Sequence, residues 1–273
     1  MTAVARRSVF GLAALVGCTS WGHQAPRPAT AAPPAAPAPA PATPTPTRSP
    51  SPEAPATGVP ADDVVVTFGD SVPAGTACDC VPFPALYARQ LSTGARSTNL
   101  ARSGLTSADI RSQVEDPATA QTIESATVII LMVGANDLAE LFDHARDADY
   151  QAAADQVEAN VGATLDRLRL LDGEDVPILV LGYWNVVRDG DVARDAYGPR
   201  TAEADVITGY VNEALRAAAA ARSARYVPTL PALKGDDGSG DPTDLLAEDG
   251  DHPNARGHAA IAAATVAAQP ASH

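Results

Sequence analysis

Five short runs of β-favouring residues, separated by amphipathic segments, set the pattern of this chain. Residues 64–68 and 127–133 show no polar alternation, which is typical of strands buried on both faces of a parallel sheet. Further strands are predicted at 96–100, 177–182 and 225–227. Between and after them, helical spacing of apolar residues predicts helices over 83–91, from 107, and over 150–171, 201–222 and 255–268. This alternation predicts an α/β fold, with a five-stranded parallel sheet between two layers of helices.

The loops after these strands carry the polar residues of interest. Ser71, Gly104 and Asn136 each follow one of the first three predicted strands. Right-handed crossovers place the carboxyl ends of parallel strands at one edge of the sheet, where α/β proteins bind their ligands. We therefore expect these three residues to lie close together.

The first 60 residues do not have the composition of a globular core. Residues 1–18 contain Arg6, Arg7, an apolar run over 9–16 and Cys18, in the order of a secretory signal peptide. The residues at 15–18 resemble a bacterial lipobox, which implies that Cys18 is lipidated and anchors the chain to the outer face of the cell membrane. Simple cleavage, leaving a spare cysteine, is the alternative, and either the general or the twin-arginine export route fits. Residues 19–60 hold 13 of the chain's 24 prolines and predict an extended linker.

The remaining residues, 61–273, have the length of one domain. Removing the four arginines and one glutamate of residues 1–60 leaves 15 basic and 32 acidic residues, a formal charge of −17. Such a field repels nucleic acids and anionic lipid surfaces, so we expect neither as a partner, and membrane contact only through the lipid anchor.

Two features of the domain contain the residue types of metal or redox sites. Cys78 and Cys80 are too close in sequence for a zinc pair of the usual spacing, and the sequence leaves open whether they form a disulfide. Acidic residues over 237–248 partly match a calcium-loop pattern, but Pro242 stands where that loop requires glycine. We expect a solvated acidic loop, no metal and no cofactor.

The last loop carries a histidine and two carboxylates. In the segment 249–253, Asp249 lies three residues before His252 and can turn back to its ring, whereas Asp251 is adjacent and points elsewhere. Acyl transfer requires a nucleophile, a base, a group that holds the base, and donors for an oxyanion. Ser71 and this loop supply the first three.

These segments, taken in order, resemble the four blocks of the SGNH, or GDSL, hydrolase family. Residues 69–71 match the first block, with Val72 where leucine is usual, Gly104 the second, residues 134–137 the third and residues 249–253 the last. The resemblance covers essentially the whole domain and implies a flavodoxin-like topology. The α/β-hydrolase alternative fits poorly, because its elbow has glycine two residues after the serine, where this chain has Pro73.

The resemblance also implies the residue roles. The catalytic triad would be Ser71, His252 and Asp249, and the oxyanion hole would consist of the Ser71 and Gly104 amides and the Asn136 side chain. We expect a monomeric ester hydrolase that forms an acyl-serine intermediate on a small acyl ester.

The loop composition suggests a substrate class. Acidic residues near the site, including Asp79, Glu140, Asp143 and Asp147, favour short acyl groups over long ones, and Tyr183 with Trp184 could stack on a sugar. We therefore expect short-chain or carbohydrate acyl esters. A long-chain lipase or phospholipase, a thioesterase, and a catalytically silent surface binding protein are the alternatives.

Overall fold

A single parallel sheet forms the centre of the domain. The computed structural model describes residues 62–142, 144 and 146–269. Within this part, five strands pair in the order β2-β1-β3-β4-β5, and every pairing is parallel. The strands are β1 (Val64–Gly69), β2 (Arg96–Asn99), β3 (Val128–Met132), β4 (Ile178–Leu181) and β5 (Arg225–Val227). The α/β fold predicted from the sequence is confirmed.

The three central strands are buried on both faces. Every residue of β1, β3 and β4 is buried, whereas the edge strands β2 and β5 retain exposed positions. This difference explains why the central strands read as unbroken apolar runs, since helices cover both of their faces.

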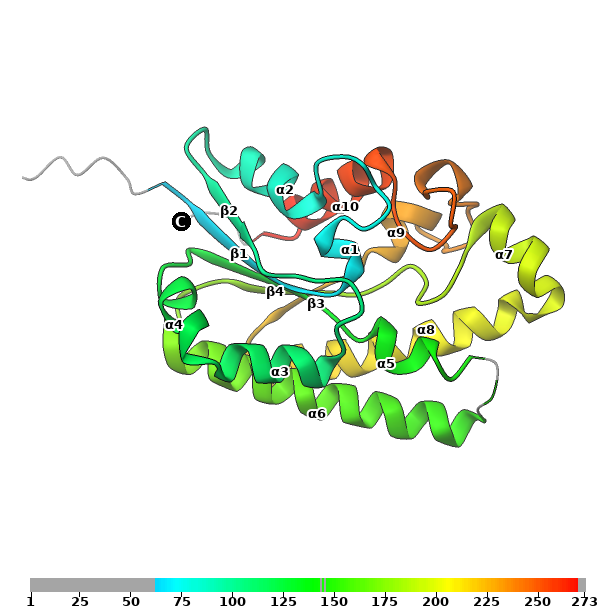
Figure 1. The fold of residues 1–273 in the computed structure, drawn as a ribbon, viewed down its shortest axis with the longest axis horizontal. Helices are drawn as coiled ribbons and strands as arrows, with labels where there is room; N and C mark the ends of the chain where they lie inside the picture. The colour runs from blue at the N-terminus through cyan, green and yellow to red at the C-terminus, as the bar shows by residue number, and fades with distance from the viewer. Residues whose placement is uncertain (1–61, 143, 145, 270–273) are drawn as a thin grey trace, which may run out of the picture. The chain divides into compact units, whose positions relative to one another are not determined.

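Helices form a layer on each side of the sheet. Figure 1 shows α2 and α10 on one face and α3, α6 and α8 on the other. The short helices α1, α5 and α7 follow β1, β3 and β4 and lie toward the end of the sheet where these strands finish (Figure 1). The α-helices are α1 (Ser71–Ala74), α2 (Phe83–Leu91), α3 (Ser107–Glu115), α4 (Pro117–Glu124), α5 (Ala135–Ala139), α6 (Asp147–Asp172), α7 (Gly190–Tyr197), α8 (Thr201–Ala220), α9 (Leu230–Lys234) and α10 (Ala255–Ala267). Two single 3-10 turns are η1 (Gly198–Arg200) and η2 (Thr243–Leu245).

Local sequence signals explain where several helices begin. Thr106 and Asp109 form a capping box at the start of α3, in which each side chain binds the other residue's backbone amide. Asn254 accepts hydrogen bonds from the first amides of α10. The helix α10 is thereby fixed directly after the loop that holds Asp249 and His252.

The predicted signal peptide (1–18), the linker (19–60) and the lipidation site Cys18 lie outside the described residues. No helix in the described part of the chain combines the length and apolar character needed to cross a membrane.

Candidate active site

Ser71 lies at the carboxyl end of the central strand β1 and opens the short helix α1. The Asp70 carboxylate caps this helix by accepting a hydrogen bond from the Val72 amide at 3.1 Å. The Asp70 amide in turn donates to the carbonyl of Met132, the last residue of β3, at 3.1 Å. Ser71 itself is half-buried, and neither its hydroxyl nor its amide has a hydrogen-bond acceptor among the described residues. Both groups are therefore available to a substrate.

The loop after β2 and the start of α5 are held together by a side-chain contact. Asn136 Nδ2 donates a hydrogen bond to the Leu105 carbonyl at 2.8 Å, which leaves its second amide hydrogen free. Gly104, one residue earlier, adopts φ 83°, a left-handed conformation that favours glycine, and is exposed. The same loop is tied to β1, because the Arg102 amide donates to the Gly69 carbonyl at 3.0 Å. The second and third sequence blocks thus meet beside the first.

A buried polar network, which the sequence reasoning missed, supports this arrangement. Asp137 accepts hydrogen bonds from the Ser107 amide at 2.9 Å and from its hydroxyl at 2.5 Å. Asn160 of α6 donates to the Ser107 hydroxyl at 3.0 Å. Burial raises the pKa of Asp137, against the opposing effect of the Ser107 hydrogen bonds. The network connects residues that are 30 and 53 positions apart, so it leaves no local sequence signal.

Asp249 and His252 form a close pair. His252 Nδ1 lies 2.7 Å from Asp249 Oδ2, while Oδ1 accepts hydrogen bonds from the Asp251 and His252 amides at 3.0 Å each. Burial raises the pKa of Asp249, but these backbone and side-chain hydrogen bonds outweigh it, and the net pKa is lowered. The carboxylate therefore stays charged where it holds the imidazole.

The neighbouring carboxylate Asp251 has a different environment. No hydrogen bond joins its side chain to His252, and burial raises its pKa, with the charges of His252 and Arg188 opposing and that of Asp249 adding to the rise. Of the two carboxylates that precede His252 in this loop, Asp249 is thus the one in contact with the imidazole.

The two halves of the site approach each other without a hydrogen bond between them. His252 is close enough to Asp70 for its charge to lower the pKa of that carboxyl. Ser71 and His252, both within the described residues, make no hydrogen bond to each other. Such bonds are often long in free enzymes and shorten when substrate binds.

Beneath Ser71 lies a buried acid that the sequence reasoning assigned no role. Asp70 is fully buried, and the Tyr183 hydroxyl donates a short hydrogen bond to it. Burial raises the pKa of Asp70 to about 7, although the bonds from Tyr183 and the Val72 amide act in the opposite direction. The partner residue is 113 positions away, so no spacing rule could have found this pair.

The expectation that Tyr183 and Trp184 stack on a sugar is wrong. Each is only 1% exposed, because the loop after β4 turns into the core. The Tyr183 amide and carbonyl are both bound by the Asn212 side chain, at 2.8 Å each. Aromatic residues that are typical of binding surfaces here fill space beneath the site instead.

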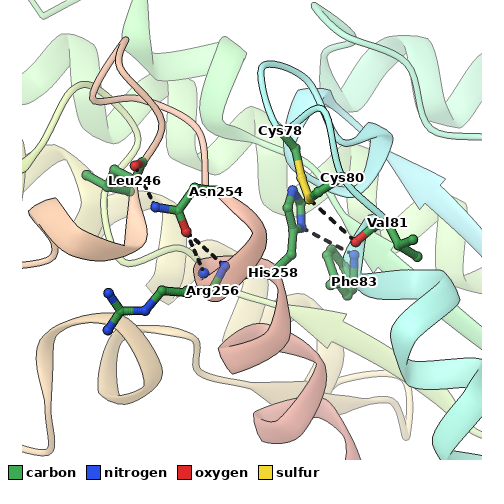
Figure 2. Close-up of a disulfide and its surroundings, with 9 residues drawn as sticks. Cys78, Cys80, Val81, Phe83, Leu246, Asn254, Arg256 and His258 are labelled. Atoms are coloured by element: carbon green, nitrogen blue, oxygen red, sulfur yellow. Dashed lines mark hydrogen bonds between the residues drawn. A yellow bond between two sulfur atoms is a disulfide. The ribbon is translucent and has the colours of Figure 1, made fainter.

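Cys78 and Cys80 are joined in a disulfide, with Cα atoms 5.0 Å apart. Figure 2 shows it beside His258 of α10, whose ring lies between the disulfide and Phe83. Among the described residues, these two cysteines and His258 are the group close enough together to hold a metal ion, but in the disulfide neither sulfur is a thiolate ligand. In the acidic loop over 237–248, the Asp237 and Asp241 carboxylates accept hydrogen bonds from the backbone amides of Ser239 and Thr243.

Comparison with known proteins identifies the kind of domain. The model of the GDSL-like Lipase/Acylhydrolase family matches residues 67–260, which is most of the chain. A search of curated protein sequences gives no significant match.

Several solved structures share the fold. A lipase, Lip_vut3, from a goat rumen metagenome is 20% identical with a TM-score of 0.63, over 76% of this chain and 97% of that one. An extracellular lipase from Streptomyces rimosus is 18% identical with a TM-score of 0.55, over 76% and 100%. Axe2, an acetylxylan esterase from Geobacillus stearothermophilus, is 19% identical with a TM-score of 0.55, over 75% and 93%. At these identities the likeness shows the fold.

Proposed function

The chain belongs to the GDSL-like lipase/acylhydrolase family of carboxylic ester hydrolases, and we propose that it cleaves esters through an acyl-serine intermediate on Ser71. The observation that carries this proposal is the 2.7 Å contact between Asp249 and His252 in the loop that ends at α10. A charged carboxylate on Nδ1 fixes the tautomer of the imidazole, so that Nε2 can accept a proton.

In the proposed reaction, His252 Nε2 takes the proton of the Ser71 hydroxyl as the oxygen attacks the ester carbonyl carbon. Asp249 holds the ring and stabilises the imidazolium that forms. The tetrahedral intermediate collapses, and His252 returns the proton to the departing alcohol. Water, activated by the same imidazole, then attacks the acyl-serine and releases the carboxylic acid.

The negative charge on the carbonyl oxygen requires donors that are free in advance. The free amide of Ser71, the exposed Gly104 and the uncommitted Asn136 amide hydrogen support the proposed oxyanion hole. The Asn136–Leu105 and Ser107–Asp137 contacts hold two of these donors in place before substrate arrives, which is the condition for a large electrostatic contribution.

We further propose that the substrates carry short acyl groups. A long acyl chain needs a continuous apolar groove beside the nucleophile, yet the exposed large hydrophobic side chains of the described residues are Val81, Leu170 and Val206. Leu170 lies on α6 and Val206 on α8, and only Val81 belongs to a loop of the site. The depression beside Asp249, of about 530 Å³, is half polar in its lining and contains one large apolar side chain; its residues are Ala77, Leu246, Ala247, Glu248, Asp249 and Asn254. The similar structures include both lipases and an acetylxylan esterase, so this choice rests on the surface of the chain itself.

A series of p-nitrophenyl esters from acetate to palmitate tests this proposal. We expect kcat/KM to be highest at two to four carbons and Ser71→Ala to remove hydrolysis of every ester. A maximum at ten carbons or longer would refute the short-chain assignment but leave the chemistry intact. Two results would refute the acyl-serine chemistry itself: ester hydrolysis that survives in Ser71→Ala, or no ester hydrolysis by the unchanged chain.

For the N-terminal segment we propose export and a lipid anchor on Cys18. The support is the sequence pattern of residues 1–18 alone. In a bacterial host, Cys18→Ala should move the protein from the membrane fraction to the soluble fraction, while Ser20→Ala serves as a neighbouring control. Unchanged membrane association of Cys18→Ala would contradict the anchor.

A further inference from the structure

The disulfide next to α10 lies against a buried histidine for which the ester chemistry has no use. A ring nitrogen of His258 lies within 4.8 Å of the sulfur atoms of both Cys78 and Cys80. His258 is fully buried, whereas the two cysteines are half-exposed. Figure 2 shows one ring nitrogen facing Phe83 and the other on the side of the disulfide.

The hydrogen bond to Phe83 decides where the imidazole carries its proton. The Phe83 amide donates to His258 Nδ1 at 3.2 Å, so Nδ1 is the unprotonated nitrogen. Burial, with a smaller effect of the His252 charge, lowers the pKa of His258 to about 4, and the ring is neutral at pH 7. The proton is therefore on Nε2, which has no hydrogen-bond partner and lies inside the protein. A buried donor without an acceptor destabilises the folded chain.

Opening the disulfide would supply that acceptor. A disulfide sulfur is a poor hydrogen-bond acceptor, whereas a thiolate is charged and accepts strongly. A metal ion on Nε2 is the less favoured partner, because the ring proton would have to move to Nδ1 and face the Phe83 amide hydrogen.

The backbone around the disulfide favours its opening as well. Ala77 and Asp79 adopt φ values of 57° and 44°, in the left-handed region that non-glycine residues rarely occupy. The cysteines are two residues apart, and a disulfide that closes so short a loop removes little entropy from the unfolded chain. Neither cysteine is fully buried, which gives an attacking thiol access to the pair.

We propose that Cys78 and Cys80 form a thiol–disulfide exchange site for dithiols, in which His258 Nε2–H stabilises the thiolate that leaves when the disulfide opens. One thiolate of the dithiol attacks a sulfur of the pair, forms a mixed disulfide and releases the other cysteine as a thiolate. The second thiol of the reagent then attacks the reagent's sulfur in the mixed disulfide. This closes the reagent's own disulfide and releases the cysteine that was still bound to it. Two electrons pass from the dithiol to the cysteine pair.

The surroundings indicate which sulfur becomes the thiolate. Cys80 Sγ lies 3.6 Å from the Val81 carbonyl oxygen, a contact in which a free thiol can donate and a thiolate would be repelled. Cys80 therefore stays protonated, and Cys78 carries the charge beside His258. Asp79, between them, is exposed, and solvent screens its opposing charge.

Alkylation rates of single cysteines test this assignment. In the full chain with Cys18→Ser, we would prepare Cys80→Ser, which leaves Cys78, and Cys78→Ser, which leaves Cys80. The rate of alkylation by iodoacetamide, followed from pH 5 to pH 10, gives the thiol pKa. At pH 7 we expect Cys78 to hold about tenfold more thiolate than Cys80, the effect of one charge-assisted hydrogen bond.

Two histidine variants serve as matched controls. His258→Asn keeps an oxygen near the Nδ1 position for the Phe83 amide but loses the donor at Nε2, and it should remove the difference between Cys78 and Cys80. His258→Gln can place an amide donor near the Nε2 position and should restore part of the difference between Cys78 and Cys80. Circular dichroism verifies that both fold.

Three results would overturn the proposal. Equal alkylation midpoints of Cys78 and Cys80 with His258 intact would do so, even if the histidine variants do not fold. A disulfide that stays closed in reduced dithiothreitol, assayed in the Cys18→Ser chain by thiol counting, would also contradict it. Stoichiometric Zn²⁺ binding by the reduced pair, lost in His258→Asn, would identify a metal site instead.

Discussion

Replacing Asp70 by asparagine should remove a large part of the pH dependence of this domain's stability. Asp70 is fully buried, and its pKa is raised from 3.8 to about 7, mainly by burial. Between these two pH values the folded chain holds a proton that the unfolded chain has lost. The free energy of unfolding therefore falls as pH rises from about 4 to about 7, and becomes level above that range.

The size of this effect follows from the difference between the two pKa values. A pKa of about 7 in the folded chain and 3.8 in the unfolded chain lowers the free energy of unfolding by about 4 kcal/mol over the whole titration. About 2.5 kcal/mol of this loss falls between pH 5 and pH 8. Asparagine is neutral throughout, and its oxygen can still accept from the Val72 amide. The variant should thus be more stable than the unchanged chain at pH 8.

Urea unfolding followed by circular dichroism, at half-unit steps from pH 5 to pH 8, measures the difference. Other carboxyls with raised pKa values, such as Asp172 and Asp251, titrate in both proteins and cancel in the comparison. Asp195→Asn, which removes an exposed carboxylate of α7, is the matched control and should follow the unchanged chain. Parallel curves for Asp70→Asn and the unchanged chain would refute a raised Asp70 pKa.

Four further substitutions probe the rest of the site. Asp249→Asn should lower kcat by about 10⁴-fold because it disturbs the tautomer of His252, and Asp251→Asn should cost far less; the reverse order in ester hydrolysis would identify the wrong carboxylate. Asn136→Ala should lower kcat by about 10²–10³-fold with little change in KM, and a change confined to KM would contradict an oxyanion role. Gly69→Ala should destabilise the domain by about 2 kcal/mol in urea unfolding, since its Cβ would lie 2.2 Å from the Met132 carbonyl oxygen, and an unchanged midpoint would contradict this packing.

The sheet and the long helices could be predicted from the sequence because their signals are local. Burial on both faces produces unbroken apolar runs, and these mark β1, β3 and β4 to within about a residue. The face of α6 is likewise visible in the spacing of Val157, Val161, Leu165 and Leu168, all of which are buried. The helices α1 and α5 were not predicted, since four or five residues carry no periodic pattern.

The contacts of the site are likewise of two kinds: local ones, which the sequence predicts, and contacts between distant segments, which it does not. A spacing of three residues was enough to anticipate the contact between Asp249 and His252. The contacts of Asp70 with Tyr183 and of Ser107 with Asp137 depend on how distant segments pack, and no pattern within either segment encodes them. The burial of Tyr183 and Trp184 could not be predicted either, because residue type alone does not distinguish an aromatic binding surface from a core.

Active-site labelling tests the central claim most directly. The full chain would be treated with a fluorophosphonate, which phosphonylates activated serines, and digested for mapping by mass spectrometry. We predict one label per chain on Ser71, lost in Ser71→Ala, slowed strongly in His252→Gln and unchanged in Ser103→Ala, the exposed serine beside Gly104. A label on another residue, or ester hydrolysis that continues in Ser71→Ala, would contradict a Ser71–His252–Asp249 hydrolase.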